Sequence, residues 1–405
     1  MHVADRGSRP YWYLSGGDAI RAIACLGILC FHVATGALFI TGDLAGSGGT
    51  LTWMTAYGEA GRIALRTAST GFYLFFVLSG FLVAAPFVSA FVEGRPRPRL
   101  RPYFRNRALR LVPAAWLLFA FVLVRHGSGG AKWNELLYMF TFTDDHVDHP
   151  LSTLVGQTWT LRVDLSFYVL VPIATILAIR LLGGRLGMAG RRRAVWAGAL
   201  AATGLSLLFA HIAENSTAAT RSPAVLLCLF MPGVVLAAAL AGREKGRAPA
   251  HLPAMATALS CLGVALLVSF PRDNLALPPR LVIVGVGAGM ALGGLVLLQR
   301  HTGRAWRWME SRPVRWVGKR TYGLYLWHLV LVAELSVLFR GAESPRWTYA
   351  VLLPLVVVTS LAVAALSYRF VERPAMRLRD RGPRTAPSAE TAPPSGETVP
   401  AAAAA

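Results

Sequence analysis

The stretch GGDAIRAIACLGILCFHVATGALF, residues 16–39, predicts a helix that crosses a membrane and carries polar side chains with it. Its apolar run reaches the roughly 20 residues that a bilayer core requires. Arg21 and His32 are eleven residues apart, close to three helical turns, so they share one face, and Asp18 lies one turn before Arg21. Polar groups are costly in hydrocarbon, and an intramembrane histidine is therefore a candidate functional residue.

The rest of the chain repeats this apolar pattern. Of the 405 residues, 55% are hydrophobic and 15% are charged, whereas a soluble domain holds roughly a quarter charged residues. The sequence predicts an all-α fold, a polytopic membrane bundle of about ten helices. The expected spans lie near residues 19–40, 70–92, 108–124, 157–179, 194–213, 222–242, 252–271, 281–299, 321–339 and 348–368.

The net charge of +21 indicates membrane topology and not a nucleic-acid partner. Of the 41 Lys and Arg residues, 30 lie in the N-terminal tail and every second connecting segment, and nine lie in the alternate segments. Positive charge gathers on the cytoplasmic side of membrane proteins, so this bias places both termini in the cytoplasm. Arg greatly outnumbers Lys, as GC-rich bacterial genomes favour. We therefore expect a multi-pass protein of a bacterial cell membrane.

Three segments are expected along the chain. Residues 1–15 form a cytoplasmic tail, residues 16–381 form the transmembrane domain, and residues 382–405, rich in Pro, Ala and Thr, form a disordered cytoplasmic tail. No removable signal peptide, internal repeat or additional domain is expected. The sequence leaves the oligomeric state open.

A second intramembrane site is GQTWTLRVDLSFYVLVP, residues 156–172. This helix is expected to enter from outside, which puts Asp164 about 10 Å below the outer surface, a depth close to that of His32. A carboxylate and an imidazole at one depth indicate an oriented general base. The alternative is that Asp164 pairs with Arg162 or Trp159 for packing alone.

A third candidate is the basic segment RPRPRLRPYFRNRALRLVPAAW, residues 95–116. Its first arginines are explained by the cytoplasmic location of the loop. Arg107 and Arg110 are one turn apart at a helix entry, where paired guanidinium groups can clamp phosphates. For Arg21 a local ion pair or an interfacial position is an equally good explanation.

A fourth polar stretch is VGKRTYGLYLWHLVLV, residues 317–332. His328 is expected about 12 Å from the cytoplasmic surface. Its neighbours Tyr322, Tyr325 and Trp327 fit an interfacial aromatic belt.

Other polar groups give weaker indications. The cysteines lack metal-ligand spacing and are expected to be buried and unpaired. HVDH, residues 146–149, could hold a metal but offers few ligands, so no metal is expected. Glu372 is expected to pair with arginines at the surface.

Six stretches, in this order, resemble the integral-membrane acyltransferase 3 family, and the resemblance covers about residues 15 to 375. They are RAIACLGILCFH, FYLFFVLSGFLV, RNRALRLVPAAW, TWTLRVDLSFYVLVP, TYGLYLWH and RFVERP.

This resemblance implies transfer of an acyl group, commonly acetyl, from a cytoplasmic acyl-CoA to a hydroxyl. The implied acceptors are cell-envelope glycans, lipid-linked sugars and glycosylated natural products. His32 matches the family's essential histidine, Arg21 its partner arginine, and Arg107 with Arg110 its R-x-x-R pair. Two positions depart from the family pattern: Asn106 replaces an arginine, and Asp164 replaces a glutamate.

The hypothesis is that His32 acts as the general base on the acceptor and is oriented by Asp164, while the three arginines bind acyl-CoA, for which the family resemblance implies acetyl-CoA. A covalent acyl-enzyme on His32 or Ser79 stays open. The alternatives are a proton-coupled transporter, since buried ionisable groups also mark transport routes, and a membrane scaffold or sensor.

Overall fold

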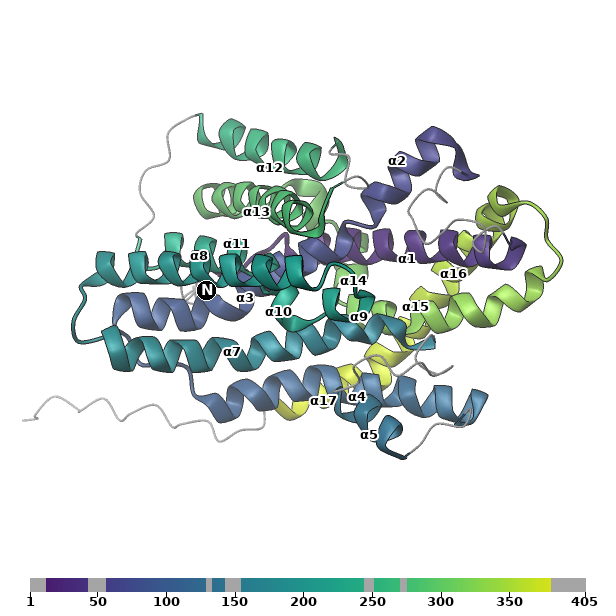
Figure 1. The fold of residues 1–405 in the computed structure, drawn as a ribbon, viewed down its shortest axis with the longest axis horizontal. Helices are drawn as coiled ribbons and strands as arrows, with labels where there is room; N and C mark the ends of the chain where they lie inside the picture. Colours follow the sequence, from purple (N-terminus) through teal and green to yellow (C-terminus); the bar gives the residue numbers. More distant parts are fainter. Residues whose placement is uncertain are drawn as a thin grey trace, which may run out of the picture.

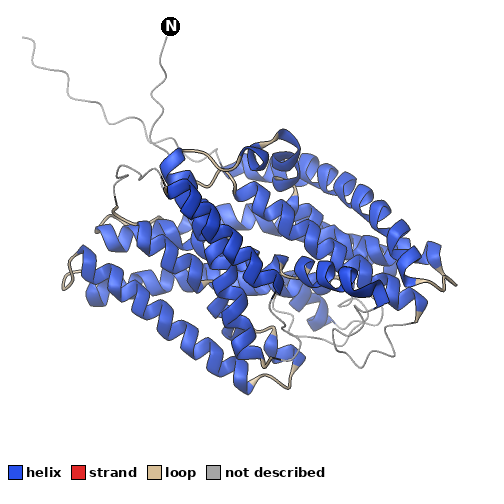
Figure 2. Cartoon of the chain, turned by 90° about the horizontal axis from the view of Figure 1, so that it is seen from above, coloured by secondary structure: helices blue, strands red, loops and turns tan. Residues whose placement is uncertain are grey.

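The computed structural model describes residues 12–42, 56–128, 133–142, 154–243, 251–269 and 275–379. Within these ranges every regular element is helical and no strand occurs (Figure 2), which confirms the all-α prediction. Most of the long helices lie side by side along the longest axis of the molecule (Figure 1). The HVDH stretch, residues 146–149, and the tail, residues 382–405, lie outside the described residues.

Nine helical segments in the described chain are long and apolar enough to cross a bilayer. They are α1 (Gly17–Thr41), α2 (Gly58–Ala68) with α3 (Gly71–Glu93), α4 (Leu100–His126), η2 (Gly156–Thr158) with α7 (Trp159–Leu182), α8 (Met188–Ile212), α12 (Leu252–Ser269), α13 (Leu277–Thr302), α15 (Thr321–Ser336) with η5 (Val337–Phe339), and α16 (Pro345–Ser367) with η6 (Tyr368–Glu372) and α17 (Arg373–Arg379).

The span expected at residues 222–242 is a broken helix. It consists of α10 (Pro223–Leu226), η3 (Leu227–Leu229) and α11 (Met231–Leu240), with a bend of 42° between the halves. Pro232 lies in the first turn of α11, where its missing N–H is tolerated but cannot continue the hydrogen bonds of the preceding helix. Counted as one span, this pair completes the ten that the sequence predicts.

Several short helices connect the spans and were not predicted. They are α5 (Trp133–Thr141), α9 (Thr217–Thr220), η4 (Arg307–Glu310) and α14 (Arg312–Gly318). Helix α4 also begins at Leu100, earlier than the expected residue 108, because Pro102 lies in its first turn and the arginines that follow favour a helix. Arg107 and Arg110 therefore stand on one continuous helix.

Helix α1 has neighbours on several sides: it contacts α2, α3, α14, α15 and α16. Two glycines allow the close approaches. A Cβ on Gly71 would meet the backbone of Ala24, and one on Gly318 would meet that of Asp18. Small residues let helix backbones come this near within a membrane bundle. The polar face of α1 is thus enclosed by protein.

The last span passes through one π-helical segment, η6, before α17. Glu372 closes that segment and is 3% exposed, and the Ser367 hydroxyl donates a hydrogen bond of 3.2 Å to its carboxylate. The expected surface pairing of Glu372 is therefore wrong. The extra residue of a π turn rotates the following side chains, and here it directs this carboxylate inward.

Candidate acyl-transfer site

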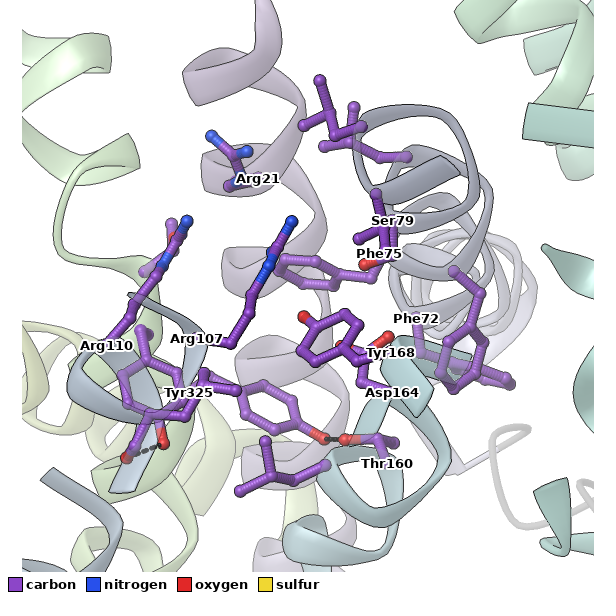
Figure 3. Close-up of a pocket in the computed structure, with 18 of the residues that line it drawn as sticks. Arg21, Phe72, Phe75, Ser79, Arg107, Arg110, Thr160, Asp164, Tyr168 and Tyr325 are labelled. Atoms are coloured by element: carbon purple, nitrogen blue, oxygen red, sulfur yellow. Dashed lines mark hydrogen bonds between the residues drawn. The ribbon is translucent and has the colours of Figure 1, made fainter. Parts of the chain in front are cut away.

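One cavity collects four of the five residues that the sequence selects. Arg21 comes from α1, Arg107 and Arg110 from α4, and Asp164 from α7. Residues of α3 and α15 complete the lining. Segments that are far apart in the sequence therefore build a single polar site inside the bundle (Figure 3).

The three guanidinium groups gather at one end of this cavity (Figure 3). Arg21 forms an ion pair of 3.0 Å with Asp18, as the local explanation expected, and lines the cavity as well. Arg107 lies over the ring of Tyr168, 4.7 Å from its centroid. Among the described residues no carboxylate forms an ion pair with Arg107 or Arg110, so these two cations are available to an anionic ligand.

The walls beyond the arginines are mostly apolar, with hydroxyl groups at the far end. The apolar lining comes from Phe72, Phe75, Phe76, Leu78, Leu82, Val83, Leu111, Leu161 and Leu326. Tyr325 and Thr160 lie opposite the arginines (Figure 3), their hydroxyl oxygens 2.7 Å apart, and the Tyr325 hydroxyl donates to the Gln157 carbonyl at 2.9 Å. A ligand with an anionic head and a thin, weakly polar arm fits such a lining.

Asp164 borders the same cavity. Its Oδ1 atom is buried and has no hydrogen-bond partner among the described residues. A buried carboxylate oxygen without a partner is costly, which indicates a place for a donor that the ligand supplies. Pairing of Asp164 with Arg162 or Trp159 is not observed among the described contacts.

His32 lies beside a second histidine. Its Nδ1 is 2.9 Å from Nε2 of His328, and the two rings stack at 5.1 Å between centroids. His328 is 1% exposed, and its Nδ1 lies 2.7 Å from the Tyr325 carbonyl oxygen. The ring of Tyr325, which lines the cavity, is 5.6 Å from that of His328. The histidine pair therefore stands next to the hydroxyl end of the cavity.

The expected hydrogen bond between His32 and Asp164 is not observed among the described contacts. His328 occupies the Nδ1 side of His32, and Asp164 faces the cavity with an unpaired oxygen. The sequence located His328 within a span, but the adjacent aromatic residues favoured an interfacial belt. His328 is expected about 12 Å from the cytoplasmic surface, and His32 lies eleven residues, or about 16 Å, beyond Arg21. These similar depths were the signal that could have linked the two histidines.

The described residues contain no group of three or more His, Cys, Asp or Glu side chains that could hold a metal ion. The four cysteines are free: Cys25 and Cys228 are buried, Cys30 is partly exposed and Cys261 is exposed.

Fold and site together define a multi-pass helical membrane protein with an arginine-lined cavity, one wall of which, Tyr325, lies beside a pair of hydrogen-bonded histidines. Residues 15–369 match the family model described as an acyltransferase domain. The chain belongs to the acyltransferase 3 family of membrane proteins.

Curated relatives carry names that specify an O-acetyl group. The chain is 24% identical over 390 residues to "Putative peptidoglycan O-acetyltransferase YrhL" of Bacillus subtilis, covering 89% of this chain and 55% of that protein. It is 21% identical over 402 residues to the peptidoglycan O-acetyltransferase OatA of Listeria monocytogenes, covering 92% and 57%. The chain thus spans little more than half the length of these relatives. No solved structure matches it.

Proposed function

We propose that this protein is a membrane-embedded O-acyltransferase that moves an acyl group from acyl-CoA to a hydroxyl of a sugar, and that this acyl group is acetyl. The observation that carries the proposal is the single cavity with three arginines at one end and, at the other, Tyr325 beside the His32–His328 pair. The acceptor class follows from the relatives named peptidoglycan O-acetyltransferases. An envelope glycan, a lipid-linked sugar or a glycosylated natural product fits this class.

In this proposal the arginine end binds the donor. Coenzyme A carries several phosphate oxygens, and guanidinium groups bind phosphate through charge-assisted hydrogen bonds. Arg107 and Arg110 have no competing ion pair among the described residues, and Arg21 stands beside them (Figure 3). The apolar walls then receive the arm that bears the thioester. The acceptor reaches the hydroxyl end, in a bacterial cell membrane whose cytoplasmic face adjoins the arginines.

Transfer needs a base at the acceptor hydroxyl. Nε2 of His32 accepts the hydroxyl proton while the oxygen attacks the thioester carbonyl. A C–O bond forms, the C–S bond breaks, and the leaving thiolate takes the proton back from Nε2. Acid–base catalysis of this kind contributes about 10²–10⁴-fold in rate. Asp164, with its unpaired oxygen in the cavity, accepts a hydrogen bond from a bound substrate.

His32→Ala in purified, folded protein tests the base. The expected result is a loss of acetyl transfer of at least about 100-fold with acetyl-CoA binding unchanged. His211→Ala, at an exposed position of α8, is the matched control and should retain full transfer. Transfer within a few-fold of wild type in His32→Ala would overturn the proposed role. Intact-mass measurement after mixing with acetyl-CoA would reveal an acyl-enzyme on His32 or Ser79.

A second pair of variants tests the donor site. Arg107→Ala with Arg110→Ala should weaken acetyl-CoA binding and flatten its dependence on ionic strength, because two phosphate contacts are lost. Arg97→Ala with Arg101→Ala removes the same charge from exposed positions outside the cavity and should leave the affinity nearly unchanged. Equal affinities for the two double variants would refute the donor assignment. Uptake of a solute by proteoliposomes without any acyl-CoA would favour a transporter instead.

A further inference from the structure

Three groups form a continuous hydrogen-bonded chain beside the cavity. The backbone carbonyl oxygen of Tyr325 lies 2.7 Å from Nδ1 of His328, and Nε2 of His328 lies 2.9 Å from Nδ1 of His32. No described residue forms a hydrogen bond with Nε2 of His32. The hydrogen-bonded chain therefore ends at Nε2 of His32.

The chemistry of these groups assigns the protons. A carbonyl oxygen only accepts, so Nδ1 of His328 must carry a hydrogen and donate it. In a neutral ring Nε2 of His328 is then an acceptor, and Nδ1 of His32 must be the donor to it. The lone pair of His32 is left on Nε2. A backbone carbonyl two groups away thus determines which nitrogen of His32 is basic.

We infer that His328 is a positioning residue, which holds His32 in the tautomer whose Nε2 can accept the acceptor's proton. This inference rests on the proposed role of His32 as base. It assigns to His328 the orienting task that sequence reasoning gave to Asp164. When Nε2 of His32 takes the proton, the Nδ1–H···Nε2 hydrogen bond to His328 becomes charge-assisted and stronger. A neutral imidazole therefore stabilises the imidazolium where other enzymes use a carboxylate.

The surrounding contacts hold this chain in place. The Gln157 side chain, 2% exposed, donates to the carbonyl of Leu326, the residue after Tyr325. The Tyr325 hydroxyl donates back to the Gln157 carbonyl at 2.9 Å. Helix α15 is thereby fixed to η2, which directly precedes α7, at the turn that carries His328. A rotation of His328 away from His32 would leave its buried nitrogen atoms without partners, which is costly.

Two near-isosteric substitutions separate positioning from packing. The amide group of Gln reaches the place of imidazole Nε2, so His328→Gln can still accept from His32 Nδ1–H. The shorter Asn reaches only the place of Nδ1, so His328→Asn keeps a donor for the Tyr325 carbonyl but loses the contact to His32. Tyr325→Phe is a control that removes the hydroxyl and retains the carbonyl.

The tautomer of His32 can be read without any turnover, from ¹⁵N chemical shifts of protein labelled at histidine in bilayers, with His32→Gln identifying the signals. We expect wild type, His328→Gln and Tyr325→Phe to carry the hydrogen on Nδ1, and His328→Asn to lose this single tautomer. In parallel, kcat should fall about 10–100-fold in His328→Asn, as for other residues that orient a functional histidine, with KM for acetyl-CoA unchanged. His328→Gln should retain most of the activity.

The outcomes separate the role of His328 from the role of His32. An unchanged His32 tautomer in His328→Asn would overturn the positioning role, whatever the activity. The same holds for full kcat in His328→Asn, or for a His328→Gln that keeps the tautomer but loses turnover. Full transfer by His32→Ala would instead overturn the proposed base and leave the tautomer result standing.

Discussion

At the scale of single residues, the site consists of polar side chains that α1, α4, α7 and α15 bring together. One cavity is lined by Arg21, Arg107, Arg110 and Asp164. These positions could be predicted because helical spacing and depth can be calculated from the sequence alone. The partner of His32 was not predicted, since the rotation of one helix against another depends on packing that no single span encodes. His328 and Asp164 were both at plausible depths. Only the structure selects between them.

Substitutions of Asp164 test whether its carboxylate binds the substrate. Asp164→Asn keeps the size of the side chain but removes the charge, and we expect kcat/KM to fall about 10–100-fold, since a hydrogen bond to a charged group contributes about 1.5–3 kcal/mol. Asp164→Glu retains the charge and restores the residue type usual in the family, so it should remain more active than Asp164→Asn. Steady-state kinetics with acetyl-CoA and a sugar acceptor measures both.

The ¹⁵N shifts of His32 provide the control for Asp164. Because no hydrogen bond between Asp164 and His32 occurs among the described contacts, Asp164→Asn should leave the tautomer of His32 unchanged. A tautomer change in this variant would restore the direct contact that the sequence suggested. A wild-type kcat/KM in Asp164→Asn would contradict a role of Asp164 in binding substrate.

At the scale of helices, hydrophobicity predicted the positions of the spans well, and the breaks poorly. An apolar run of about 20 residues has few alternatives in a bilayer, so the ten expected spans all have a counterpart in the structure. The bend between η3 and α11, the π segment η6 and the early start of α4 depend on local hydrogen bonding and packing. Mean apolar character over a window does not contain that information.

Helices α3 and α11 cross at two glycines. A Cβ on Gly80 would meet the carbonyl of Phe230, and one on Gly233 would meet the carbonyl of Val77, so the two backbones touch. Gly80→Ala must separate them, which costs about 1–3 kcal/mol. Since α3 carries Phe75 and Ser79 of the cavity, acetyl transfer should fall as well.

Thermal unfolding in detergent measures the effect against a matched variant. Gly204, on α8, has no atom within 4 Å of a built Cβ, so Gly204→Ala should be neutral or raise Tm slightly through its better helix propensity. Gly80→Ala should lower Tm. A Tm for Gly80→Ala at or above that of wild type would contradict a backbone contact between α3 and α11.

At the scale of the whole molecule, the direction of the bundle decides which compartment supplies the donor. Arg21 lies in the second turn of α1, and the arginine end of the cavity is therefore on the side where α1 begins. The segment between α13 and α15 belongs to the arginine-rich set of connections, and the segment before α16 belongs to the opposite set. The positive-inside rule therefore predicts that the arginine end faces the cytoplasm, where acyl-CoA is made.

Cysteine accessibility in intact cells tests this orientation. In a background without the four native cysteines, Arg304→Cys and Glu343→Cys each introduce one thiol at an exposed position, in the arginine-rich and the opposite set respectively. A membrane-impermeant maleimide should label Glu343→Cys in intact cells, and Arg304→Cys only after permeabilisation. The reverse pattern would place the three arginines outside, where no acyl-CoA is available. The donor would then have to be another acyl carrier, even if the His32–His328 pair performs the same proton transfer.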